Sequence, residues 1–306
     1  MSDPNGKIVL GPNQYGKAES RVVRVYRDTA RHEIRDLTVS TCLRGEFGPA
    51  HVAGDQGTVL PTDSQKQTVY AYAKTHGAGS IEDYGLALAR HFVGDVAPVD
   101  SARIEIEEHA WERAQAGGGP HDHTWTRRGP EVRTAAITVR GTGSERREWV
   151  IGGIKDLVLL KSTGSEFAGF LTDEFTVLEP THDRMMATSL AARWRFAATP
   201  PDWDAAYAGI KAILVERFAL LQSKALQQTL FDMGRSALEA YPCLAEIRLS
   251  APNKHHFDYD LERFGIENSG EVFYAADRPY GLIQATVQRE NAPDAGIAWD
   301  PFTGAI

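Results

Sequence analysis

The segment Glu246-Ile247-Arg248-Leu249-Ser250 alternates polar and charged residues with apolar ones. Successive side chains of a strand point to opposite faces of its sheet, so this alternation predicts a half-buried β-strand. We expect Pro252 to end the strand, because proline cannot donate to the hydrogen-bond ladder. The polar run Asn253-Lys254-His255-His256 follows directly, at the predicted edge of a sheet. Such a run can carry function or can be a solvated loop, and its sequence alone fits both.

The same alternation recurs along the first half of the chain, in two pairs of segments that flank two helical patterns. The predicted strands lie around residues 23–26, 37–43, 102–110 and 134–139. The predicted helices begin at Thr62 and at Ser80, and end near the glycines that follow them.

The second half repeats this order without obvious sequence identity. Its strands are predicted over residues 150–160, 184–196, 246–250 and 283–287. Its helices begin at Pro201-Asp202 and after Ser223. The chain is therefore predicted to be a tandem duplication of a ββααββ unit.

Helices gathered on one face of an antiparallel sheet define the α+β class, which is the predicted fold class. The boundary is expected near Thr142-Gly143-Ser144, which gives one domain over residues 1–143 and another over 144–306. A four-stranded sheet leaves open edges that need partners, so we expect a homo-oligomer closed through its sheets.

The predicted helix starts rest on capping residues. Thr62 is followed three residues later by Gln65, which is the pattern of a capping box. Ser80 and Ser223 are predicted to cap the helices that follow them.

The composition limits the classes of function. The 306 residues are 42% hydrophobic and 24% charged, which is ordinary for a folded protein. The net charge of -8 argues against a broad nucleic-acid-binding surface. Cys42 and Cys243 are the only cysteines and lack metal-type spacing, so neither a disulfide framework nor a zinc site is indicated. A cytoplasmic location is expected, with no membrane segment.

Several polar residues have both a structural and a chemical interpretation. Lys17 is most simply a solvated lysine, and Thr62 a helix cap. The free amides at the helix start, including that of Asp63, can also bind a small anion. Gln227 is a tolerated helix residue or a planar hydrogen-bonding ligand. Arg184 can pair with its neighbour Asp183 or hold a planar anion.

Other motifs point to no cofactor. His121 and His123 resemble a metal-binding pair, but no third ligand is close in sequence. The glycines at 117–119 lack the strand and helix context of a dinucleotide site. A Walker sequence and a GxSxG motif are both absent.

Signatures spread over nearly the whole chain give a resemblance to a known family. They are Asn13 to Lys17, Thr62 to Ser64, Leu160 to Phe167 with Gly169-Phe170, Asp183-Arg184, Gln227, Pro252 to Phe257, and Asp277 to Ile283. In this order, they resemble the urate oxidase (uricase) family. The resemblance implies two tunnelling-fold (T-fold) domains and a homotetramer with active sites at subunit interfaces.

The resemblance also implies a reaction: urate is oxidised by molecular oxygen to 5-hydroxyisourate and hydrogen peroxide, with no metal, flavin or other cofactor. Carried over by motif, Lys17, Thr62 and His255 match the catalytic proton relay. His255 is chosen over His256 because it lies two residues after Asn253, as in the family pattern. His256 and Lys254 are then given structural or surface roles.

The same resemblance implies the residues that bind the substrates. Arg184 and Gln227 are expected to grip opposite sides of the purine, with Phe167 stacked on it and the Leu226 amide contacting a urate oxygen. Thr62 and the Asp63 amide are expected to approach from a neighbouring subunit. Asn253 and Thr62 are expected to hold oxygen above the ring.

Two rival functions remain open from the sequence. One is another T-fold purine or pterin enzyme, such as a cyclohydrolase-type hydrolase. The other is a urate- or purine-binding regulator without turnover. A dependence on metal distinguishes the first, and an absence of oxygen consumption distinguishes the second.

Overall fold

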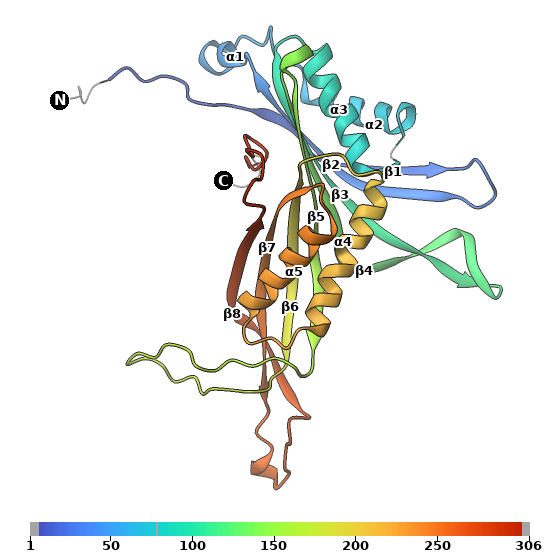
Figure 1. Ribbon diagram of the computed structural model, residues 1–306. Helices are drawn as coiled ribbons and strands as arrows, with labels where there is room; N and C mark the ends of the chain where they lie inside the picture. Colours follow the sequence, from blue (N-terminus) through green and yellow to red (C-terminus); the bar gives the residue numbers. More distant parts are fainter. Residues whose placement is uncertain (1–5, 78, 302–306) are drawn as a thin grey trace. The chain divides into compact units, whose positions relative to one another are not determined.

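The structure is a computed structural model that describes residues 6–77 and 79–301. Its elements follow the expected order, with one additional short helix, α1 (Figure 1). They are β1 (Tyr15–Tyr26), β2 (Glu33–Gly45), α1 (Gly48–Ala53), α2 (Thr62–Thr75), α3 (Ile81–Asp95), β3 (Val99–Ala116), β4 (Gly119–Arg140), β5 (Arg147–Lys161), β6 (Met186–Phe196), α4 (Trp203–Leu220), α5 (Leu226–Ala240), β7 (Leu244–Asp258) and β8 (Phe273–Gln288). Short 3-10 turns cover Gly143–Glu145 and Glu262–Phe264.

The chain divides into two compact units. Unit 1 comprises Met1–Arg127, Thr134–Ile151 and Asp294–Ile306, and unit 2 comprises Arg128–Arg133 and Gly152–Pro293. Each unit carries two strands, a pair of long helices and two further strands, which is the tandem α+β arrangement. The division at residues 143 and 144 stays a prediction.

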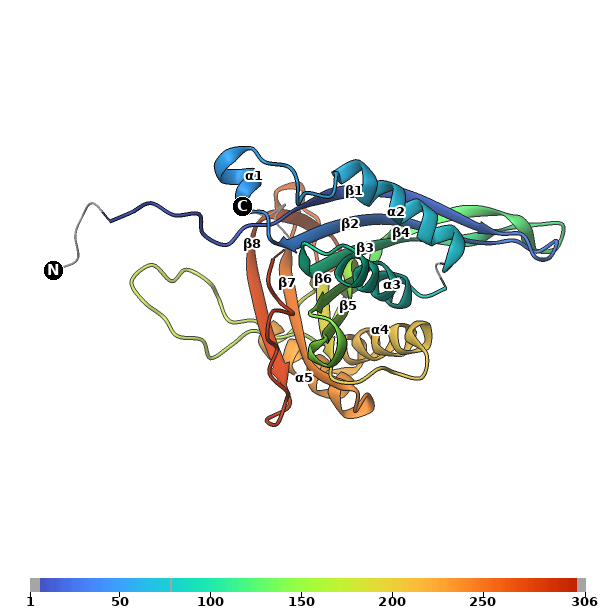
Figure 2. The ribbon, with the colours of Figure 1, turned by 90° about the horizontal axis from the view of Figure 1, so that it is seen from above.

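In unit 1, β1, β2 and β3 form an antiparallel ladder. Alternating residues such as Val39, Ile104 and Ile106 are fully buried, and α2 and α3 lie along one face of these strands (Figure 2). Gly85 lets α3 lie very close to the sheet, because a Cβ there would be 2.5 Å from Cδ1 of Ile137. Burial of this apolar face drives the layering, since each large aliphatic side chain contributes about 1.5–3 kcal/mol.

Unit 2 is built in the same way. Strands β6, β7 and β8 are antiparallel neighbours, and α4 and α5 pack together above them. Trp194 and Ile247 are buried at this interface. Gly234 permits close packing of α5, because an added Cβ would be 2.6 Å from Cγ2 of Val287.

Two of the predicted helix caps are wrong. Pro61 takes the N-cap position of α2, and Thr62 is the first helical residue. Gln65 does not complete a capping box: its Oε1 accepts a hydrogen bond from Thr41 Oγ1 at 2.7 Å, and its Nε2 donates to the Leu60 carbonyl at 3.5 Å. The cap of α5 is Ala225 and not Ser223. Ser80, in contrast, accepts from the Asp83 amide at 3.1 Å, as expected.

The predicted end of the strand at Pro252 is also wrong. Strand β7 continues to Asp258, and β8 pairs with it on both sides of the proline. The register shifts between Asn253 and His255, so the ladder contains a bulge at the polar run. The partner strand keeps the segment extended even though Pro252 cannot donate.

None of the helices in the described part of the chain combines the length and apolar character that crossing a membrane requires.

Candidate functional site

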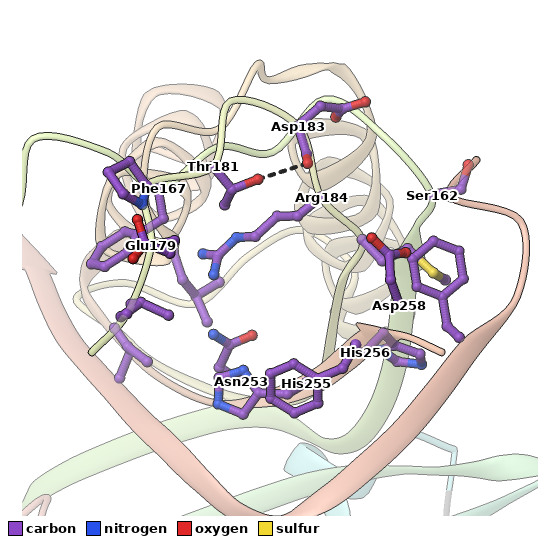
Figure 3. Close-up of a pocket in the computed structure, with 18 of the residues that line it drawn as sticks. Ser162, Phe167, Glu179, Thr181, Asp183, Arg184, Asn253, His255, His256 and Asp258 are labelled. Carbon is purple, nitrogen blue, oxygen red and sulfur yellow. Dashed lines mark hydrogen bonds between the residues drawn. The ribbon is translucent and has the colours of Figure 1, made fainter. Parts of the chain in front are cut away.

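A pocket of about 870 Å³ opens in unit 2. Its walls come from β7, from the first turn of α5 and from residues 162–185, the long connection between β5 and β6 (Figure 3). All six site residues that the sequence predicts for the second half line it: Phe167, Arg184, Leu226, Gln227, Asn253 and His255. Residues distant in sequence therefore converge on one cavity.

Backbone hydrogen bonds fix the long connection beside α5. Ser165 pairs with Ser223 just before the helix, and the amide of Glu166 donates to the Ser223 carbonyl at 2.8 Å. Further along, Phe167 and Thr181 exchange two backbone hydrogen bonds of 2.8 and 2.9 Å. The two ends of the connection are thus held against each other and against the helix start.

Arg184 points into the pocket from this fixed backbone (Figure 3). Its amide donates to the Ser165 carbonyl at 2.8 Å, and its guanidinium carbon lies 5.2 Å from the centre of the Phe167 ring. Its Nε is buried without a hydrogen-bond partner among the described residues. Burial also lowers the pKa of Arg184. A buried charged donor without a partner favours an anionic ligand in this pocket.

The carboxylate of Asp183, the neighbour of Arg184, forms its hydrogen bonds with other residues. Its carboxylate accepts from Thr163 Oγ1 at 2.8 Å and from the Gly164 amide at 3.0 Å, and the bond from Thr163 is the main reason for its lowered pKa. Thr181 Oγ1 donates to the Asp183 carbonyl at 2.8 Å. Of the two interpretations of Arg184, the geometry therefore favours the grip on a planar anion.

Aromatic rings form one wall of the pocket. Phe167 stacks on Phe170 with ring centres 5.0 Å apart, and His255 stacks on Phe257 at 5.7 Å. Flat rings beside a guanidinium suit a flat, electron-rich ligand, because stacking and ionic contact then act on the same molecule.

Asn253 and His255 lie on β7, on either side of the bulge. The pKa of His255 is lowered by burial first, and then by the positive charge of Arg184. The neutral imidazole is therefore favoured, and a neutral imidazole can accept a proton.

The remaining predicted residues belong to unit 1. Lys17 lies on β1, and its amide donates to Thr41 Oγ1 at 3.2 Å. Thr62 and Asp63 are exposed in the first turn of α2. The pKa of Asp63 is lowered mainly by its hydrogen bond to Lys66, and Lys17 adds a smaller effect. Strand β1 and the start of α2 thus bring Lys17 and this helix turn into one neighbourhood.

Several pocket residues were missed by the sequence reasoning. His256, given a structural or surface role, lines the pocket beside His255, and Glu179 and Asp258 line it as well (Figure 3). His256 pairs regularly with Ala275 beyond the bulge, and no pattern in the sequence predicted its place at the pocket.

The histidine pair of β4 is a separate cluster in unit 1. The rings of His121 and His123 are 4.4 Å apart, and His32 lies 6.1 Å from His123. Across residues 6–77 and 79–301, no group of three or more histidine, cysteine or acidic residues has the arrangement of a metal site.

Comparisons with known proteins place the chain in one family. The Uricase family model matches residues 13–138 and 150–284. A uricase of Arthrobacter globiformis is 48% identical over 298 residues, covering 97% of this chain and 96% of that protein. A uricase of Dictyostelium discoideum is 33% identical over 282 residues, covering 92% and 97% respectively.

Solved structures give the same result for the fold. The crystal structure of the Arthrobacter globiformis uricase superposes with a TM-score of 0.91 at 47% identity, covering 97% of this chain and all of that one. A mutant urate oxidase from Bacillus sp. TB-90 superposes with a TM-score of 0.82 at 21% identity, over 90% of this chain and 99% of that one, which supports the fold alone. Family model, sequence relatives and fold thus agree along nearly the whole chain, and the chain belongs to the uricase family.

Proposed function

We propose that this chain is a urate oxidase that works without a metal or organic cofactor, and that the pocket of unit 2 holds the purine. The observation that carries the proposal is Arg184, whose buried Nε lacks a partner among the described residues and whose guanidinium lies beside the Phe167 ring. A planar anion such as urate satisfies both groups at once. Gln227, at the exposed start of α5, supplies an amide for the other edge of the purine.

The reaction needs proton transfer and orientation more than a strong electrophile. Urate is electron-rich, and loss of a further proton makes it a better electron donor. Two electrons then pass to molecular oxygen, which takes up two protons and leaves as hydrogen peroxide. The oxygen atom of water is added at C5 of the purine and gives 5-hydroxyisourate. Side chains that hold and move protons can contribute about 10²–10⁴-fold to such a rate.

The residues divide these tasks between them. His255, whose pKa is lowered, accepts a proton from the side of β7. Lys17 favours the deprotonated form of the Thr62 hydroxyl through its positive charge, so the three residues form a relay. Asn253 holds oxygen, or the water that follows it, over the ring, which is an orientation effect.

We further propose that a complete site needs two copies of the chain. Thr62 and Asp63 are exposed at the start of α2, and their free backbone amides suit contact with an anion. In this assembly they approach the pocket of a neighbouring copy within a homotetramer. A cytoplasmic location is part of the same proposal and rests on the sparse cysteines.

The direct test uses purified full-length protein stripped of metal by a chelator. Incubation with urate in aerated buffer should remove the urate absorbance, consume oxygen and release peroxide in equal amounts. A turnover that appears only after metal or flavin is added would contradict the cofactor-free reaction. Loss of urate without oxygen consumption would favour the hydrolase, and binding without any turnover would favour the regulator.

A further inference from the structure

The sheet of unit 2 has a second polar face, opposite to α4 and α5. The strand register places Arg193 of β6 directly across from Arg248 of β7. Strand β8 then sets Thr286 beside Arg248, and Gln284 beside Ser250. Since side chains alternate along a strand, these residues share one face, and Asn253 of the urate pocket lies on the other.

Cationic side chains outnumber carboxylates along two neighbouring strand segments of this face. Arg195 and Glu246 form a buried ion pair at 2.6 Å, with 4% and 5% of their side chains exposed. Glu246 also lies 3.6 Å from the Nε of Arg248. In the described rows Ala191–Arg195 and Glu246–Ser250, this face carries three guanidinium groups and one carboxylate. Like charges directly opposite each other destabilise a sheet, so the pairing of Arg193 with Arg248 lowers the stability of the protein when no ligand is bound.

The same residues line a groove. It has a volume of about 350 Å³ and is lined by Arg193, Arg248, Ser250, Gln284 and Thr286, with small apolar groups between them. The Gln284 amide already donates to Ser250 Oγ at 3.2 Å, so the hydroxyl hydrogen of Ser250 is left to donate elsewhere. Two forked cations and two hydroxyls thus converge on a space large enough for a small ligand.

We propose that this groove is a second anion site, built for a small tetrahedral oxyanion of the phosphate class. The planar fork of arginine matches the oxygens of such an ion, and charge-assisted bonds of this type are about twice as strong as neutral ones. The anion also offsets the repulsion between Arg193 and Arg248. Because the protein as a whole carries a charge of -8, this groove is a local exception to its surface.

Calorimetric titration with inorganic phosphate at constant ionic strength tests the site. The experiment uses an Arg184→Gln background, so that the urate pocket does not contribute a guanidinium. The parent protein should give saturable binding, and the Arg193→Gln/Arg248→Gln pair should weaken it about tenfold or more. Arg263→Gln, an exposed arginine of the same unit, serves as the matched control and should leave the affinity unchanged.

The same pair of substitutions in otherwise wild-type protein should retain urate oxidation. Should the pair fail to fold, as judged by circular dichroism, Arg248→Gln alone is titrated and should weaken binding about fivefold. Non-saturable heats in the parent, or equal affinities in the parent and the folded variants, would overturn the proposal.

Discussion

Both units of the chain use the element order ββααββ, and the pocket of about 870 Å³ lies in unit 2. In unit 1 a short turn at residues 27–32 joins β1 to β2. In unit 2, residues 162–185 join β5 to β6 and fold back onto the start of α5. The layers of sheet and helix therefore set the scaffold, and the longer connection supplies a wall of the pocket in unit 2.

The proposed function assigns urate binding to unit 2 and proton transfer largely to unit 1. Substitutions in the two units should then lower activity in different ways, through urate binding in unit 2 and through kcat in unit 1. The predictions below run from the largest expected effect to the smallest.

Arg184→Gln should give the largest loss. It removes the charge that faces the planar anion, and kcat/KM for urate should fall about 100- to 1000-fold. The loss of urate absorbance at several concentrations measures it. Arg263→Gln, on an exposed turn of the same unit, should stay within about twofold of the wild type. A similar kcat/KM in both variants would mean that Arg184 does not bind urate.

Lys17→Ala and Thr62→Ala should lower kcat about 100-fold and leave urate affinity nearly unchanged. Both residues serve the relay more than the grip on the purine. Lys74→Ala, in the last turn of α2, is the matched control and should not alter kcat. If urate binding and kcat fell equally, the proposed division between the two units would be wrong.

Mixed assemblies sharpen the contrast further. Lys17→Ala and Arg184→Gln damage different units, so a complete site can form between one copy of each variant. Co-expression of the two inactive chains should restore roughly a quarter of the sites if partners associate at random. Activity no higher than that of either variant alone would contradict a site shared between copies.

The charge of Arg184 should also be visible in the titration of His255. Its pKa lies below 6.5 in the folded protein, through burial and Arg184, so stability from this group is full above pH 6.5 and is lost as the pH falls through the folded pKa. Proton NMR should show the pKa of His255 rising in Arg184→Gln. It should not move in Arg263→Gln. An unchanged value in Arg184→Gln would mean that burial and His256 lower the pKa of His255 without help from Arg184.

The smallest effects concern helix starts. Ser80 accepts from the Asp83 amide, so Ser80→Ala should lower the free energy of unfolding by about 1 kcal/mol. Thr62 caps nothing in α2, so Thr62→Ala should change it by less than about 0.5 kcal/mol. Urea unfolding at one protein concentration measures both. A larger loss of unfolding free energy in Thr62→Ala would mean that Thr62 stabilises the fold.

Much of the fold followed from the sequence, because alternation and helical spacing are local signals. The two ββααββ repeats and the Ser80 cap came from such patterns. The continuation of β7 through Pro252 did not, because it depends on pairing with β8, which is distant in sequence. The cap at Ser223 failed for a local reason: the helix begins after Ala225, and the Ser223 hydroxyl lies 2.8 Å from that of Thr229 in the first turns of α5.

The candidate site also contains residues that the sequence indicated and residues that it did not. Arg184, Gln227 and Asn253 were found through the family resemblance, and alternation or spacing alone left each of them with two interpretations. His256 was given a structural or surface role, because the family pattern singled out His255, yet both histidines line the pocket. Glu179 and Asp258 carried no pattern at all.

The two hydrogen bonds between Phe167 and Thr181 close residues 168–180 into a loop whose ends are tied together. The outer part of this loop exposes Leu171 and Phe175 by 96% and 79%. Extra residues placed between them would lengthen the loop at little entropic cost and would not strain the backbone that holds Arg184. We therefore expect a peptide inserted between Leu171 and Thr172, ahead of the turn in which the Asp173 carboxylate accepts from the Phe175 amide and from Thr176 Oγ1, to leave the shape of the pocket unchanged.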